Sequence, residues 1–197
     1  MLTLQKSDLQ LVLPAIDWSK RPRRFMNPGE LEAIVALVRS VNAKGVLEFG
    51  VNTGRTAQAI LEYCPTVETY EGVDVPLGYV TEKAVQRGEV PQIPGELVKD
   101  DPRFTLIVRP TGSHELTPQD LRPCDAVFID GDHSEKGVRN DTMLALELTR
   151  PGGIIMWHDY HDLGTVDVRE VLHDMQKEFP AAPFRHVPGT WIVYLKV

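Results

Sequence analysis

The sequence predicts a doubly wound α/β domain built on a mostly parallel sheet, and three observations support this prediction. Short apolar runs typical of buried strands alternate with segments whose apolar residues recur at helical spacing. Two of these runs end at Gly50 and Asp74, at the strand ends where such sheets bind ligands. The last two strand-like runs flank Pro188–Thr190, which predicts a β-hairpin that adds an antiparallel edge.

The elements follow in a regular order after an irregular start. We interpret residues 1–28, which contain three prolines, as an N-terminal arm or lid, and residues 29–197 as the domain. The expected strands are 44–50, 67–75, 103–110, 124–130, 152–159 and the two arms of a hairpin in 184–197. The expected helices are 28–41, 56–64, 78–88, a short one from His114, 134–150 and 166–179. The segment 89–103, rich in proline, glycine and charge, predicts an exposed loop. The core residues expected from the last two helices are Met143, Leu144, Leu146, Leu148, Val166, Val168, Val171, Leu172 and Met175.

Length and composition are those of one soluble globular domain, with 197 residues, 42% hydrophobic and 25% charged. The net charge of −7 argues against a dedicated nucleic-acid-binding protein, because phosphate contacts need a basic face. We interpret the basic stretch Lys20–Arg24 as a solvated part of the arm. Two cysteines without metal-ligand spacing predict a reducing compartment, and no signal-peptide pattern or membrane-spanning run is seen. We therefore expect a cytoplasmic protein.

A glycine-containing turn follows the first expected strand. The segment VLEFGVNTG places Glu48, Gly50 and Gly54 between a strand and a helix, where glycines let the backbone approach a ligand. The spacing differs from the dinucleotide pattern G-x-G-x-x-G, and an acid stands where a pyrophosphate would be repelled. An acid at this place suits a ligand with a cationic end.

Asp74 closes the second expected strand, twenty residues beyond Gly54. An acid at this place can accept hydrogen bonds from both hydroxyls of a ribose. Glu71 is a near neighbour that could compete for this role. The alternative for Asp74 is a helix N-cap or turn residue.

The order of these and later motifs resembles the class I S-adenosylmethionine-dependent methyltransferases over roughly Glu30 to Val197. The segments that carry the resemblance are VLEFGVNTG, GVDV, RPTGSHEL, CDAVFIDGDH and TRPGGIIMWHDY. The chain is most similar to small-molecule O-methyltransferases with an IDGDHS…PGG…HDY pattern. The resemblance implies a Rossmann-like, seven-stranded sheet whose last strand is antiparallel.

The resemblance also implies where S-adenosylmethionine binds. By position, Glu48, Gly50 and Gly54 line the methionine end and Asp74 binds the ribose. The turn after the third strand, formed by Gly112, Ser113 and His114, borders the adenine. We also expect Asp130, after the fourth strand, to contact S-adenosylmethionine.

Acidic and histidine side chains follow two strands that we expect to be neighbours, in the segments FIDGDH and MWHDYHD. They are Asp130, Asp132, His133, His158, Asp159, His161 and Asp162. Oxygen ligands suit magnesium, calcium or manganese, and mixed imidazole and carboxylate ligands also suit iron or zinc. A divalent ion there could bind a substrate hydroxyl and lower its pKa. Asp130 is the member for which we favour function most, because an acid at the end of a buried run has few structural uses.

Metal-dependent relatives that this sequence resembles take one ligand after the fourth strand and two adjacent ligands after the fifth. This implies Asp130, His158 and Asp159 as metal ligands. His158 departs from the pattern, because the relatives usually present an acid or amide there. It could instead pack or donate a hydrogen bond beside the metal.

The base in similar enzymes lies two or three residues beyond the first ligand, which implies Asp132 or His133. We favour His133, because an unperturbed imidazole has its pKa near the operating pH. Asp132 would need its pKa raised, and it could instead cap the helix that begins at Ser134.

Other residues of these segments have plainer interpretations. We interpret His161 and Asp162 as solvated loop residues and Trp157 as a core residue. Cys124 precedes its strand, whereas a nucleophile should follow it, so we interpret it as a small buried residue.

These features predict methyl transfer from S-adenosylmethionine to a hydroxyl of a small molecule, a sugar or secondary metabolite, assisted by Mg²⁺ or another divalent metal. The alternative is a catalytically silent S-adenosylmethionine-binding module with a regulatory or scaffolding role. The acidic and histidine constellation favours an enzyme, since a binder needs only the motifs of the first half. We expect a small hydroxylated partner and no nucleic acid or membrane. The sequence leaves open which acceptor and metal are used and whether the chain forms a homo-oligomer.

Overall fold

The computed structural model describes residues 4–20, 26–80, 83 and 90–197 of the chain. Most of the basic stretch Lys20–Arg24 and most of the helix expected over 78–88 lie outside these residues. The segment 90–103 contains neither helix nor strand and is largely exposed, as expected, although Gly95 and Val98 are buried.

A single mixed sheet forms the centre of the fold, with the strand order β1-β7-β8-β6-β5-β2-β3-β4. The strands are β1 (Gln5–Lys6), β2 (Gly45–Phe49), β3 (Thr69–Asp74), β4 (Phe104–Val108), β5 (Cys124–Ile129), β6 (Thr149–Trp157), β7 (Arg185–His186) and β8 (Val193–Lys196). β8 pairs antiparallel with β6 and β7, and the other described pairs are parallel. The predicted doubly wound α/β class, with a mostly parallel sheet and a C-terminal antiparallel hairpin, is confirmed.

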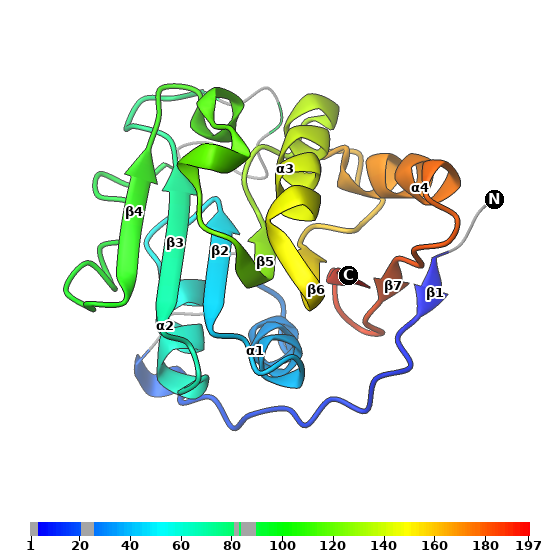
Figure 1. The fold of residues 1–197 in the computed structure, drawn as a ribbon, viewed down its shortest axis with the longest axis horizontal. Helices are drawn as coiled ribbons and strands as arrows, with labels where there is room; N and C mark the ends of the chain where they lie inside the picture. The colour runs from blue at the N-terminus through cyan, green and yellow to red at the C-terminus, as the bar shows by residue number, and fades with distance from the viewer. Residues whose placement is uncertain (1–3, 21–25, 81–82, 84–89) are drawn as a thin grey trace.

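The sheet has eight strands among the described residues, not seven, because the arm contributes β1. β1 pairs with β7, and Ser7 N–H donates to the carbonyl of His186. The sequence suggested that the hairpin forms an edge of the sheet. In the structure β1 forms that edge, beyond the hairpin. From β1 the arm runs past one end of the sheet toward α2 (Figure 1), and Leu4 and Ile16 are buried along it.

Within the described residues, four α-helices cover the two faces of the sheet (Figure 1). They are α1 (Glu30–Ser40), α2 (Arg55–Tyr63), α3 (Glu135–Leu148) and α4 (Val168–Glu178). Short 3₁₀ turns are η1 (Trp18–Lys20), η2 (Gly112–Glu115) and η3 (Pro118–Asp120), so the short helix expected from His114 is a 3₁₀ turn beginning at Gly112. None of the helices in the described parts of the chain is long and apolar enough to cross a membrane.

Alternate strand residues divide the core into two layers. Val46 and Phe128 pack under α1 and α2, and their neighbours Leu47 and Val127 pack under α3 and α4. Every core residue expected in α4 and its approach is buried. In α3, Leu144 and Leu148 are buried and Leu146 is partly buried, but Met143 is 47% exposed because it lies off the buried stripe of that helix.

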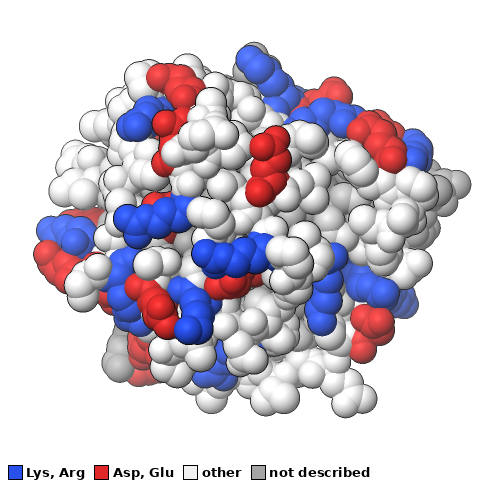
Figure 2. Space-filling model, viewed as in Figure 1, with Lys and Arg blue, Asp and Glu red and all other residues white. Residues whose placement is uncertain are grey.

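The arrangement of strands positions the site. β2, β3, β5 and β6 are parallel and adjacent, so their carboxyl ends meet at one edge of the sheet. The chain order reverses between β2 and β5, which is where ligands bind in sheets of this kind. On the face shown in Figure 2, basic and acidic side chains are intermixed.

Candidate active site

The glycine loop after β2 has a backbone that only glycine adopts easily. Gly50 has φ 85°, and a Cβ added there would overlap the backbone carbonyl of Asp130 at the tip of β5. Gly54 precedes α2 with φ 87°, and a Cβ there would press on Val98. The loop therefore packs tightly between the β5 tip and the segment 90–103.

Glu48, predicted to line the methionine end of the cofactor, is buried in β2. Its carboxyl accepts a hydrogen bond from the Tyr70 hydroxyl at 2.8 Å. Burial raises the pKa of Glu48 well above its usual value, and the charges of Asp130 and Asp74 raise it further against the hydrogen bond from Tyr70. Burial thus favours the uncharged form of this acid, and its hydrogen bond with Tyr70 links β2 to β3.

Asp74 fastens the glycine loop to the end of β3. Its Oδ2 accepts from Asn52 N–H at 2.8 Å and its Oδ1 accepts from Val75 N–H at 2.7 Å. Burial raises the pKa of Asp74, although these N–H groups oppose the shift. The turn role that the sequence left open is therefore present, and the ribose contact stays a prediction. Glu71 does not compete, because it pairs with Arg122.

The turn predicted to border the adenine is held in place by hydrogen bonds to side chains of α3. Ser113 is buried and its hydroxyl donates to Asp141, while Asn140 Nδ2 donates to Ser113 Oγ at 3.0 Å. Burial raises the pKa of Asp141 to about 7. Asp141 is a residue that the sequence reasoning missed, since it is one acid among many in a helix.

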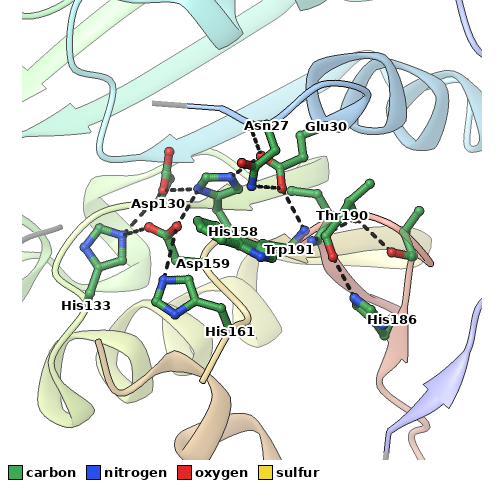
Figure 3. Close-up of polar contacts among 12 residues, drawn as sticks. Asn27, Glu30, Asp130, His133, His158, Asp159, His161, His186, Thr190 and Trp191 are labelled. Atoms are coloured by element: carbon green, nitrogen blue, oxygen red, sulfur yellow. Dashed lines mark hydrogen bonds and ion pairs between the residues drawn. The ribbon is translucent and has the colours of Figure 1, made fainter. Parts of the chain in front are cut away.

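Asp130, His133 and Asp159 converge at the tips of β5 and β6 (Figure 3). One donor atom from each lies within 4.8 Å of the others, close enough for one ion. His133 Nε2 lies 3.0 Å from Asp159 Oδ2 and 3.5 Å from Asp130 Oδ1. This nitrogen is buried and makes no hydrogen bond of standard geometry within the described chain. The structure thus unites two of the three predicted ligands, with His133 as the third donor.

The charges in this group depend on one another. Burial alone would lower the pKa of His133, but the carboxylates of Asp130 and Asp159 outweigh it and raise the pKa to about 10. Burial opposes ionisation of Asp159, but contacts from His133 and His158 hold the pKa of its carboxyl well below the usual range. Asp159 also has φ 57°, a left-handed backbone that is uncommon outside glycine and is found at functional sites.

His158 lies between carboxylates on both sides of its ring. Its Nδ1 is 3.2 Å from Asp130 Oδ1 and 3.4 Å from Asp159 Oδ1, and its Nε2 is 3.0 Å from Glu30 Oε2. Burial would lower the pKa of His158, but these acids outweigh it and raise the pKa well above the usual value. Both nitrogens face carboxylates, which favours the alternative that His158 makes hydrogen bonds beside the metal, and its role as a ligand stays a prediction.

The remaining residues of the two tips have different surroundings. Asp132 Oδ1 accepts from Ser134 N–H at 3.0 Å and its Oδ2 lies 3.7 Å from His114 Nε2. The α3 cap is Ser134, whose hydroxyl accepts from Gly137 N–H, so the alternative left open for Asp132, that it caps this helix, is wrong. Trp157 is a core residue, as expected.

His161 and Asp162, both expected to be solvated, differ. His161 is buried edge-on against Trp191, with ring centroids 4.4 Å apart, and its Nε2 lies 3.9 Å from Asp159 Oδ1. Its expected solvation was therefore wrong. Asp162 is exposed, as expected, with a side chain 77% accessible and 3.9 Å from Arg169.

Glu30 is the second residue that sequence reasoning missed. The spacing of Asn27 and Glu30 at the start of α1 resembles a capping pair, and Glu30 does accept from Asn27 N–H at 2.6 Å. That local signal does not reveal the contact with His158, 128 positions away in the chain.

Comparison with known sequences identifies the family. The sequence profile of a family described as "Methyltransferase domain" matches residues 47–160, more than half of the 197-residue chain. The chain belongs to this methyltransferase domain family. No curated protein sequence matches the chain significantly.

Solved structures share the fold of this methyltransferase domain. The SAH-bound methyltransferase PaMTH1 of Podospora anserina superposes with a TM-score of 0.62 at 14% identity, over 85% of this chain and 77% of that one. An O-methyltransferase from Bacillus cereus in complex with SAH gives 0.57 at 15% identity, over 91% and 86%. TomG from Streptomyces achromogenes, an O-methyltransferase of tomaymycin synthesis solved with SAM, gives 0.58 at 16% identity, over 87% and 81%.

The matched range of the methyltransferase domain includes the glycine loop, Asp74, Asp130, His133 and Asp159. Glu30 and Trp191, which contact the tips of β5 and β6 from α1 and the hairpin, lie outside it.

Proposed function

We propose that this methyltransferase domain transfers a methyl group from S-adenosylmethionine to a hydroxyl of a small molecule, a sugar or secondary metabolite, with a divalent metal ion assisting. The observation that carries the proposal is the convergence of Asp130, His133 and Asp159 beside the glycine loop. Structures of similar fold bound to SAM or SAH support the choice of cosubstrate.

The cosubstrate end of the proposal uses the loop between β2 and α2. S-adenosylmethionine supplies the methyl group when bound. Gly50 and Gly54 let the backbone approach the methionine end, Asp74 lies at the ribose position, and Gly112 to His114 lie at the adenine position. Because Gly50 packs against the backbone of Asp130, the methyl donor and the acidic tips occupy neighbouring strand ends.

The metal part of the proposal rests on the donor set. A buried imidazole nitrogen without a standard hydrogen bond faces two carboxylates, and this mixed donor set suits Mn²⁺, Fe²⁺, Zn²⁺ or a similar divalent ion. Asp130, His133 and Asp159 would hold the ion. His158 would orient the two aspartates through the contacts of its Nδ1 with their Oδ1 atoms. An ion bound there lowers the pKa of an acceptor hydroxyl.

The two candidate bases from the sequence, His133 and Asp132, then take different roles. With its pKa raised to about 10, His133 carries a proton at neutral pH, and it must lose that proton before acting as base or ligand. We assign His133 to the ion, because its Nε2 faces both carboxylates. Asp132, near His114, is the remaining candidate base from the sequence.

The test is S-adenosylhomocysteine formation with a panel of hydroxylated sugars and phenols, and with the matching amines as controls. We expect turnover with one or more hydroxyl compounds, none with their amine counterparts, and loss of turnover with a chelator. Turnover that the chelator leaves unchanged would remove the metal from the proposal. Binding of S-adenosylmethionine without turnover on any compound would favour the silent binding module.

A further inference from the structure

Glu30 is a fully buried acid at the first residue of α1. Four donors surround it: Asn27 N–H at 2.6 Å, Asn27 Nδ2 at 3.0 Å, Trp191 N–H at 2.7 Å and His158 Nε2 at 3.0 Å. Burial would raise the pKa of Glu30, but His158 and the other donors outweigh it and lower the pKa. Because the carboxylate is buried and these four groups hydrogen-bond to it, its position and orientation are fixed.

The contact with His158 continues to the proposed active site (Figure 3). Glu30 Oε2 lies 3.0 Å from Nε2 of His158, and the Oδ1 atoms of Asp130 and Asp159 lie 3.2 Å and 3.4 Å from its Nδ1. The ring is therefore fixed at both ends. It holds the Oδ1 atoms of the two aspartates, while Asp159 Oδ2 faces His133.

We infer that Glu30 is a positioning residue of the methyl-transfer site, acting through His158 to orient Asp130 and Asp159. The inference rests on the proposed function, since it concerns the carboxylates that would hold the ion. Partners of this kind, one contact removed from a metal, fix the orientation of the ligands.

Glu30 also joins the site to two segments outside the family match at 47–160. Asn27 belongs to the arm, and Trp191 belongs to the loop of the C-terminal hairpin. Trp191 reinforces the link, because its carbonyl accepts from Tyr160 N–H at 3.0 Å and its ring packs on His161. The position of Asp159 thus depends on both ends of the chain meeting at one carboxylate.

The test substitutes Glu30→Gln, which keeps the shape and the acceptor for Trp191 but removes the carboxylate that receives the His158 N–H. Mn²⁺ affinity is measured by electron paramagnetic resonance of free Mn²⁺ in the presence of S-adenosylhomocysteine, together with steady-state kinetics. We expect Mn²⁺ affinity and kcat to fall about 10- to 100-fold. The KM for S-adenosylmethionine and the affinity for S-adenosylhomocysteine should stay within about twofold, because Glu30 contacts none of the predicted cofactor residues.

Glu32→Gln is the matched control, because it removes the same charge from the same helical turn. Glu32 accepts from Trp18 Nε1 at 2.8 Å, away from His158, and its glutamine variant should behave as wild type. Glu30→Asp retains the charge with a shorter reach and should recover part of the loss. It replaces Glu30→Gln in every comparison if the glutamine variant does not fold.

The outcomes separate the inference from the proposed function. Wild-type Mn²⁺ affinity and kcat in the Glu30 variants would overturn the inference and leave the proposed function standing. Parallel losses of Mn²⁺ and S-adenosylhomocysteine affinity would also overturn it, because they indicate general damage to the fold. A wild-type protein that transfers methyl groups but binds no Mn²⁺ would remove the metal and this inference together.

Discussion

The two halves of the carboxyl edge of the sheet are built in different ways. On the β2 and β3 side, main-chain geometry dominates: Gly50 and Gly54 take left-handed conformations, and Asp74 accepts from backbone N–H groups. On the β5 and β6 side, side chains dominate, with carboxylates placed around His133 and His158.

This difference assigns a separate physical constraint to each half. The half at β2 and β3, where we propose that the cofactor binds (the cofactor half), is limited by space, so a single added Cβ should disrupt it. The acidic half is limited by charge, since each histidine owes its raised pKa to carboxylates and Asp159 owes its lowered pKa to histidines. Removing one charge there should change the ionisation of its neighbours while the backbone keeps its shape.

The largest effect should come from Gly50→Ala. The change combines a positive φ with overlap of the Asp130 carbonyl, so we expect a loss of about 3 kcal/mol or more in unfolding free energy. Gly152→Ala is the control, because Gly152 has φ 86° with open space around its Cβ position, and it should cost about 1 to 2 kcal/mol. Urea denaturation measures both, and equal losses would show that crowding at β5 contributes nothing.

Asp141→Asn tests whether the ionisation of a side chain also affects stability on the β2 and β3 side of the site. Its folded pKa of about 7 lies above the ordinary 3.8, so its contribution to stability is fully present below about pH 4 and is lost as pH rises through 7. As the pH rises from about 4 to above 7, about 4 kcal/mol of stability is lost, at about 1.4 kcal/mol for each pKa unit between 3.8 and about 7. Denaturation of wild type and Asp141→Asn at several pH values should show a flatter profile for the variant. Identical profiles would mean that Asp141 ionises normally.

Asp159→Asn tests the acidic half directly. The amide removes the charge that both His133 and His158 face, so methyl transfer should fall by about 100-fold or more, beyond the 10- to 100-fold typical of outer partners. Affinity for S-adenosylhomocysteine, measured by calorimetry, should change less than about threefold if the two halves are independent. A matching loss of both would contradict the division between them.

The same division explains what the sequence could predict. The strands, the glycine loop and the positions of Asp74, Asp130 and Asp159 follow from short patterns, in which a buried run ends at a glycine or an acid. β1 has no such pattern, since it is two exposed residues that pair only because the arm returns to β7.

Contacts between distant segments could not be predicted in this way. The resemblance to metal-dependent relatives assigned His158 to the metal by position, but Glu30, 128 residues away in the chain, contacts its Nε2. His161 was expected in solvent because nothing nearby in the chain covers it, whereas Trp191 does so from the hairpin. Ionisation follows these contacts, so the ordinary pKa assumed for His133 failed for the same reason.

His133→Ala distinguishes a ligand from a base at the centre of the acidic half. As a ligand, His133 supplies one of three donors, so we expect Mn²⁺ affinity, measured by calorimetry, to fall about 100-fold or more, beyond the 10- to 100-fold typical of outer partners. If the variant binds Mn²⁺ as tightly as wild type while kcat falls about 10²- to 10⁴-fold, the side chain is the base that the sequence favoured.

Asp162→Asn should have the smallest effect and marks where the acidic half ends. Asp162 lies three residues beyond Asp159 in the same segment, yet its side chain is exposed and its partner Arg169 is 3.9 Å away. An exposed pair of this kind contributes at most about 1 kcal/mol, so turnover and Mn²⁺ affinity should stay within about twofold of wild type. Steady-state kinetics beside Asp159→Asn gives the contrast directly. A loss near that of Asp159→Asn would mean that Asp162 reaches the acceptor or the ion, and that the acidic half extends past His161 into the loop before α4.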